Sequence, residues 1–358
     1  MAYISFQPKD YFNTKLYTGN ATTDHAQTGV GFQPDWLWIK ERGGTGGHIL
    51  VDAVRGVSAS STPFVKSNAS GAEVSSNTND FIKSLDSDGF TLGADSYFTD
   101  VNKNSSTYVA WNWRAGTGAG SSNTDGSINT VSTSVNTTAG FSISKYTGTG
   151  SNATIGHGLG EVPKLIMVKN ASIDVDWVVY HSALGATKNL RLNTNEQVDT
   201  SSSIWYNTEP TSSVFSIGTA TASNGNGNTH VAYCFAEKKG YSKFGQFKGR
   251  GNNDGTFVYT GFKPAFVMVR FIDASNGYDF VMYDNKRPRA ENPAGNILEA
   301  NTTDAENTGT AFHCDFSSGG FKFRGTESNV NDGGYDYLYW AFAEEPLVSS
   351  NDVPATAR

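Results

Sequence analysis

This chain of 358 residues contains a few pairs of acidic side chains whose type and spacing are compatible with cleavage of a glycosidic bond. That reaction needs two carboxyl groups across a groove, and candidates are Asp86 with Asp88 and Asp332 with Asp336. Aspartate beside glycine is more typical of turns, where its carboxylate accepts backbone hydrogen bonds. We therefore interpret these residues as turn formers and expect no enzymatic activity.

Other reactive groups are scattered. The six histidines show no HExxH spacing, and the sequence contains no GxSxG, GxxxxGK[ST] or GxGxxG pattern. Cys234 and Cys314 have no partner at metal-ligand spacing, so we expect both to be buried. The segments 86–89 and 329–333 resemble the start of a calcium loop but lack its later glutamate, which leaves structural calcium as the alternative to a plain turn. We expect no cofactor.

Composition excludes several classes of partner. Charged residues make up 17% of the chain and the formal net charge is −7, so there is no basic surplus for a nucleic acid. No apolar run is long enough to span a bilayer, and the N-terminus lacks the features of a signal peptide. We expect no membrane insertion and synthesis in the cytoplasm without an export signal.

One ordered set of signals occurs three times, at a period of about a hundred residues. Each copy has a Gly-x-x-Pro turn leading into an apolar run that ends in a base, and closes on an aromatic run. The Pro-led runs are 31–40, 160–169 and 261–270, and the closing runs are 108–113, 230–235 and 337–342. Short runs rich in Val, Ile and aromatic residues between polar turns indicate β-strands.

A second apolar run in two of the copies ends in Asp-x-x-Arg, namely Asp52 with Arg55 and Asp284 with Arg287. The second copy has His181 at the aspartate position. A paired Asp and Arg in a turn satisfies polar groups that would otherwise be orphaned. We interpret both as structural ion pairs that hold the strand exit.

Helical periodicity is nearly absent, so the predicted fold class is all-β, with tandem antiparallel β-sandwich modules of jelly-roll type in three diverged copies. We expect an extended array in which each module has a separate hydrophobic interior. The predicted parts are an N-terminal docking arm (1–16), module 1 (17–116), a Gly/Ser/Thr/Asn-rich linker (117–139), module 2 (140–239), module 3 (240–347) and a flexible C-terminal tail (348–358).

Tryptophans offer a second kind of candidate site. Trp36 with Trp38, and Trp111 with Trp113, each place two rings on one face of a strand, and we predict that they fill the core of module 1. The alternative is a stacking platform for sugar rings.

A further tryptophan stands apart from these pairs. Trp205 and Tyr206 occupy a variable stretch of module 2, which favours a surface contact there.

The run Gly240-Tyr241-Ser242-Lys243-Phe244-Gly245, continued by 249–255 and 261–269, resembles repeat-built structural and tail-fibre-like proteins of marine tailed bacteriophages. The resemblance covers residues from 141 to 345. It implies a virion structural protein, in the tail rather than the head, and a fibre or fibre-like component that attaches to a host surface glycan or protein. A head-decoration or tail accessory protein is one alternative, and a glycan-hydrolysing tail spike is another.

Partners follow from the same resemblance. Analogy with fibres favours a homotrimer. The arm is too apolar for a free tail, so we expect Phe6, Pro8, Tyr11 and Phe12 to dock onto another virion protein or a neighbouring subunit.

Overall fold

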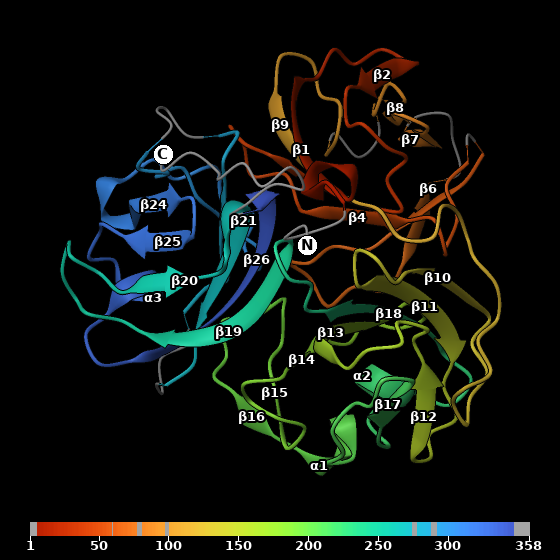
Figure 1. Cartoon of the computed structure of the whole chain (residues 1–358). Helices are drawn as coiled ribbons and strands as arrows, with labels where there is room; N and C mark the ends of the chain where they lie inside the picture. The colour runs from red at the N-terminus through yellow and green to blue at the C-terminus, as the bar shows by residue number, and fades with distance from the viewer. Residues whose placement is uncertain are drawn as a thin grey trace.

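The computed structural model describes residues 6–58, 60–76, 81–96, 100–273, 278–287 and 292–346. Residues 1–5 of the predicted arm and the predicted tail, 348–358, lie outside the described residues. The fold is all-β and antiparallel, as predicted. Three lobes surround a common centre (Figure 1): lobe 1 spans residues 12–113, lobe 2 spans 132–236 and lobe 3 spans 242–346.

Each lobe contains one large sheet. Lobe 1 has β1 (Phe12–Thr18), β9 (Thr107–Trp113), β3 (Trp36–Glu41) and β4 (Ile49–Asp52), in that order. Lobe 2 has β10 (Ser132–Asn136), β11 (Phe141–Thr147), β18 (Thr229–Ala236), β13 (Pro163–Asn170) and β14 (Val178–His181). Lobe 3 has β19 (Ser242–Lys248), β26 (Asp336–Pro346), β21 (Phe262–Phe271), β22 (Val281–Asp284) and β23 (Leu298–Glu299). In every lobe the closing strand lies between the opening strand and the Pro-led strand.

Smaller sheets complete the lobes. They are β2 (His25–Thr28) with β8 (Gly89–Leu92) and β7 (Ile82–Asp86), β12 (Ala153–Gly156) with β17 (Val214–Ile217), β20 (Phe257–Tyr259) with β25 (Gly320–Phe323) and β24 (Cys314–Ser317), β5 (Thr62–Phe64) with β6 (Val74–Ser76), and β15 (Lys188–Asn189) with β16 (Asp199–Thr200). The helices are the single turns α1 (Ser202–Trp205), α2 (Thr221–Asn224) and α3 (Ser328–Asn331), and the 3-10 turns η1 (Pro8–Asp10) and η2 (Thr310–Phe312). Within the described segments, no helix has the length and apolar character that crossing a bilayer requires.

The three lobes also repeat individual contacts. An aromatic ring of the opening strand stacks on a ring of the closing strand in each lobe: Tyr17 on Tyr108, Tyr146 on His230 and Phe247 on Tyr337, with centroids 5.0, 5.1 and 5.1 Å apart. A buried asparagine amide in each lobe donates to a glycine carbonyl: Asn102 to Gly93, Asn224 to Gly218 and Asn331 to Gly325. These equivalences support the interpretation of one unit in three copies.

The hydrophobic core has four parts. Each lobe has its own core, and a fourth cluster at the centre takes aromatic side chains from all three large sheets. Strand β9 contributes to two of them, because Tyr108 and Ala110 face the core of lobe 1 while Trp111 and Trp113 face the centre. Each lobe thus has the separate interior that was expected, but the expectation of an extended array is wrong, because the lobes also share the central cluster. Both faces of the large sheets are apolar, so each sheet needs a second cover, which the other lobes supply.

The two tryptophan pairs are buried, as predicted, but they fill this shared centre rather than the interior of module 1 alone. Trp36 is 1% exposed and stacks on Tyr233 of lobe 2, with ring centroids 4.7 Å apart. The void left among these rings has a volume of only 10 Å³. The side chains of the three sheets therefore fill nearly all of the centre.

Residues of the predicted docking arm pack on the chain itself. Phe12 is 2% exposed and belongs to the central cluster, and Pro8 is buried. Phe6 and Tyr11 lie with ring centroids 5.8 and 6.2 Å from that of Tyr241. The prediction that these side chains dock onto another protein is therefore wrong for Pro8 and Phe12, because the chain's own core covers their apolar surface. Phe6 and Tyr11 are half-buried, and for them docking stays a prediction.

Two boundaries in the structure also differ from the predicted ones. Strand β1 begins at Phe12, so the first large sheet starts inside the segment assigned to the arm. The predicted linker 117–139 contains β10, which forms a hairpin with β11 and extends the sheet of lobe 2. Both differences arise because strand pairing, which a single sequence does not display, recruits short polar or mixed runs at sheet edges.

Candidate functional site

The recurrent Asp-x-x-Arg residues form buried ion pairs, as predicted. Arg55 Nε lies 2.6 Å from Asp52 Oδ2, and Arg287 Nε lies 2.5 Å from Asp284 Oδ2. The side chains of both pairs are at most 2% exposed. Each arginine also donates to the carbonyl of the strand that it follows, through Nη2, at 2.9 Å in both lobes. The pairs therefore fix the ends of β4 and β22.

These strand ends also hold the lobes together. Tyr233 of lobe 2 donates from Oη to Asp52 Oδ2 at 2.7 Å, and Trp111 of lobe 1 donates from Nε1 to Asp284 Oδ2 at 3.0 Å. At the third junction His181 of lobe 2 lies with Nε2 3.3 Å from the Tyr339 carbonyl oxygen of lobe 3. Lobe 1 thus contacts lobe 2, lobe 2 contacts lobe 3 and lobe 3 contacts lobe 1, which closes a ring.

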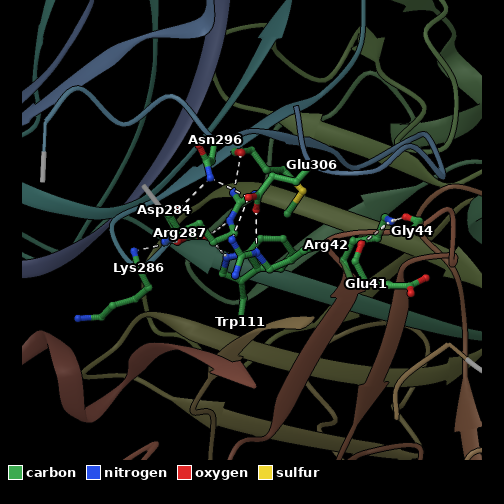
Figure 2. A network of polar contacts seen from close by, with 11 residues as sticks. Glu41, Arg42, Gly44, Trp111, Asp284, Lys286, Arg287, Asn296 and Glu306 are labelled. Atoms are coloured by element: carbon green, nitrogen blue, oxygen red, sulfur yellow. Dashed lines mark hydrogen bonds and ion pairs between the residues drawn. The ribbon is translucent and has the colours of Figure 1, made fainter. Parts of the chain in front are cut away.

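Figure 2 shows the junction of lobes 3 and 1. The Arg287 guanidinium lies over the Trp111 ring, 5.4 Å from its centroid. Glu306 bridges two cations, since its Oε2 lies 3.3 Å from Arg287 Nη1 and it accepts from Arg42 at 2.9 Å through both oxygens. Asn296 donates to Glu306 Oε1 at 2.7 Å. The network links lobe 1, through Arg42, to the loop that follows β23.

A second ring of contacts comes from the bases that end the Pro-led strands. Each buried cation donates to a backbone carbonyl of a neighbouring lobe: Lys40 to Thr303 at 3.2 Å, Lys169 to Ser70 at 2.9 Å, and Arg270 to Glu196. Burial lowers the pKa of Lys40 and of Lys169 to about 8, and that of Arg270 to about 10. The sequence showed a base at this position in every copy, but its contact with another lobe was not predicted.

The acidic pairs considered for catalysis have local partners. Asp88 accepts from the Gly29 and Gly31 amides at 3.0 and 2.7 Å and so joins its own turn to the one that follows β2. Asp86 accepts from the Thr91 hydroxyl at 2.6 Å.

The other acidic pair behaves in the same way. Asp332 accepts from the amide of Gly333 at 2.8 Å, and Asp336 pairs with Lys248 at 3.1 Å. In the part of the chain that the structure describes, no cluster of three or more His, Cys, Asp or Glu side chains suits a metal ion. Cys234 and Cys314 are buried and free, as predicted.

The predicted surface pair in module 2 is half correct. Tyr206 is 52% exposed, but Trp205 is 2% exposed and belongs to the core of lobe 2, so its prediction as a surface contact is wrong. The physical reason is that Ile204 and Trp205 lie on one turn of helix, α1, whose apolar side faces the lobe. Tyr206, at the left-handed C-cap of that turn, points its ring away from the core.

A pocket of 360 Å³ lies next to α1, where lobe 2 meets lobe 1. Besides Val175 of the loop before β14, its apolar part consists of Val178, Ile204 and Ala222. These three side chains come from β14, α1 and α2, three elements that are distant in sequence. The polar part of its lining is Ser70 of lobe 1 together with Asp174, Asp176, Asn189, Arg191 and Asp199 of lobe 2.

Most polar groups of the pocket are fixed by neighbours. Asp176 accepts from Asn193 Nδ2 at 2.7 Å and lies 3.4 Å from Arg191 Nη1. Asp174 accepts from the Ala72 amide of lobe 1 at 2.7 Å. These contacts hold the walls of the pocket in place before any ligand arrives, a property that favours binding.

The predicted sites did not include this pocket, because its lining residues come from strands, helical turns and loops that are separate in the sequence. Its residues follow no sequence motif, and only Ile204 adjoins the pair Trp205 and Tyr206 that was singled out. A signal that points toward it is the number of polar side chains between 189 and 199, in the variable part of the second copy.

Comparison with known proteins places the whole molecule in one family. The family model described as a domain of unknown function, DUF7483, matches residues 7–346. No curated protein and no solved structure matches the chain. The match spans all three lobes as one unit, and the chain belongs to the DUF7483 family.

Proposed function

We propose that this chain is a non-enzymatic structural protein of a bacteriophage virion, a tail fibre or fibre-like component that takes part in host attachment. The observation that supports this proposal is the closed ring of buried contacts between the lobes, from Tyr233 with Asp52 to Trp111 with Asp284. Such a body opens only when several buried polar contacts break together. Slow unfolding of this kind suits a particle that must persist outside a cell.

The ionisable groups support a structural role. His48, whose pKa is lowered by burial, accepts from Trp38 Nε1 at 2.8 Å and contacts the Glu299 carbonyl oxygen of lobe 3 at 3.0 Å. The Nζ groups of Lys40 and Lys169 donate hydrogen bonds to backbone carbonyls. Groups that are committed to such contacts stabilise the arrangement of the lobes and are not free to exchange protons with a substrate.

The proposed partners are other virion proteins and a host surface glycan or protein, with the chain in the virion, in the tail rather than the head. Self-association as a homotrimer also belongs to the proposal, by analogy with fibres. Light scattering of the purified chain tests the trimer directly, because a molar mass of 38.4 kDa would contradict it. The proposed place of synthesis is the host cytoplasm.

Labelling of purified particles tests the location. A gold-conjugated antiserum against the chain should mark the tail, and quantitative mass spectrometry should give on the order of tens of copies per particle. Label over the head with on the order of hundreds of copies would favour the decoration protein instead. Release of reducing ends from host envelope polysaccharide by the purified chain would contradict a non-enzymatic role.

A further inference from the structure

We propose that the pocket between lobes 1 and 2 binds one neutral or aminated sugar unit of a glycan. The inference deepens the proposed function, on which the identification of the glycan as a host surface component rests. The pocket's 360 Å³ lies near the lower end of the range for small-molecule sites, about 300–1,000 Å³. This size suits one sugar ring with its substituents and excludes a peptide segment with several side chains.

The lining has the two kinds of surface that a sugar ring presents. Val178, Ile204 and Ala222 can pack against the C–H groups of a ring face. The carboxylates accept hydrogen bonds from hydroxyl groups, whereas the Arg191 guanidinium donates to them. Because every sugar hydroxyl is both donor and acceptor, a wall that carries both kinds of group can satisfy adjacent hydroxyls on the same ring.

Asp199 is the group that has most capacity left for a ligand. It is exposed at the edge of the pocket on β16. Among the described residues, its carboxylate contacts Asn189 Nδ2, which lies 3.5 Å from Oδ2. That distance is beyond the usual range for an N–H···O hydrogen bond. A ligand hydroxyl or ammonium can therefore bind Asp199 without displacing a strong internal partner.

Charge decides which sugars fit. Three aspartates, Asp174, Asp176 and Asp199, line the pocket against the single cation Arg191. Lys169 lies behind the wall, where its Nζ donates to the Ser70 and Val175 carbonyls at 2.9 and 2.7 Å. The carboxylates outnumber both cations, so a sugar that carries a carboxylate or phosphate is repelled, whereas a hydroxyl or ammonium is attracted.

Ligand titration of the full-length chain by NMR tests this inference with three probes: galactose, glucosamine and galacturonic acid. We expect galactose or glucosamine to bind with a millimolar Kd, as one sugar unit usually does, and galacturonic acid to bind at least about tenfold more weakly. Asp199→Asn should weaken binding about fivefold or more. The matched control is Asp125→Asn, which removes one exposed carboxylate of the segment before β10 and should leave the Kd unchanged.

A second variant fills the site. Ala222→Phe places a ring in the space lined by Val178 and Ile204 and should abolish binding, while thermal unfolding reports whether the variant still folds. Preference for galacturonic acid, or equal binding by the wild type and Asp199→Asn, would overturn the inference.

The two proposals fail separately. Attachment of the chain to host cells that is unchanged in Asp199→Asn contradicts the sugar pocket and leaves the attachment role standing. Sugar binding that Asp199→Asn weakens, in a chain that particles do not contain, supports the pocket and contradicts the virion role.

Discussion

The Tyr233 phenol donates a hydrogen bond to the Asp52 carboxylate across the boundary between lobes 2 and 1, with Oη 2.7 Å from Oδ2. The same oxygen accepts from Arg55 Nε at 2.6 Å. Both Tyr233 and Asp52 are 0% exposed, so water does not compete for these bonds. In a buried site the hydrogen bond is electrostatically stronger than in water, and an unpaired partner is correspondingly costly.

Removal of the Tyr233 hydroxyl should therefore weaken the whole molecule. We expect Tyr233→Phe to lower the free energy of unfolding by about 1–3 kcal/mol, because Asp52 loses a partner that buried water cannot replace. Urea unfolding monitored by tryptophan fluorescence measures the change. Tyr206→Phe is the matched control. Because Tyr206 is 52% exposed, this variant should show no measurable loss of stability. Equal stabilities of the two variants would contradict the role given to this contact.

The shared centre predicts one cooperative unfolding transition. Phe342 of lobe 3 packs with Trp113 of lobe 1 and Phe235 of lobe 2, with ring centroids 5.6 and 5.5 Å apart. Phe342→Ala should therefore destabilise all three lobes together, by about 3–5 kcal/mol. Differential scanning calorimetry should show a single peak that shifts as a whole to lower temperature. Three separate peaks, with one of them shifted, would indicate lobes that unfold independently.

The positions of the main strands could be predicted from the sequence. The closing run predicted at 108–113 is β9 (Thr107–Trp113), and the second run of the first copy is β4 (Ile49–Asp52). Runs of β-branched and aromatic residues between Gly, Asn and Asp turns specify strands locally, so no long-range information is needed. The buried Asp-x-x-Arg turn was predictable for the same reason, because its two members are three residues apart.

The arrangement of the lobes could not be predicted in this way. Trp111 and Tyr108 are both aromatic and lie on opposite faces of β9, and the sequence does not say that one face meets a lobe core and the other meets the centre. Contacts such as Tyr233 with Asp52 join residues that are 181 positions apart. The pocket has the same origin, since its walls come from segments of two lobes that are far apart in the sequence.

One repeated feature was present in the sequence and was missed. An asparagine side chain in each lobe accepts a hydrogen bond from the backbone amide of the residue just before β4, β14 or β22. Asn68 accepts from His48, Asn193 from Trp177 and Asn301 from Phe280, at 2.8 to 2.9 Å. Each asparagine directly follows a buried residue, Ser67, Leu192 or Ala300. Comparison of the three copies at this position would have identified a shared structural asparagine.

His181 predicts a dependence of stability on pH. Its Nδ1 accepts from the Ala183 amide at 3.1 Å, which leaves Nε2 as the protonated nitrogen that donates to the Tyr339 carbonyl oxygen. Burial lowers the pKa of His181 to about 4. Below pH 6.5 the unfolded chain takes up a proton that the folded chain does not, so stability falls between pH 6.5 and 4 and changes no further below that range.

A difference measurement isolates this effect. The free energy of unfolding of the wild type minus that of His181→Gln should fall by about 3 kcal/mol between pH 6.5 and 4. Subtraction removes the contributions of other groups, including that of Glu299, whose pKa is raised by burial to about 7 and whose effect has the opposite sign. A difference that is constant across this range would contradict a neutral, buried His181.

The last prediction concerns the N-terminal segment, whose apolar residues pack inside the molecule. Phe12 stacks on Phe342 of lobe 3 and lies against Trp113 of lobe 1, with ring centroids 5.6 and 4.9 Å apart. Phe12→Ala should cost about 3–5 kcal/mol of stability, because it leaves a cavity where two lobes meet. Phe6→Ala should cost less, since Phe6 is partly exposed and packs only at the edge of the central cluster.

Chemical denaturation of the two purified variants measures which of them loses more stability. A segment that served only to dock onto another protein would give the opposite result, with wild-type stability for Phe12→Ala and a loss confined to assembly. Because β1 pairs with β9 along its whole length and Phe12 belongs to the shared centre, removal of residues 1–16 should destabilise all three lobes rather than leave an intact body that lacks an arm. Loss of dispersed signals throughout the NMR spectrum of the truncated chain would establish that this segment is part of the fold.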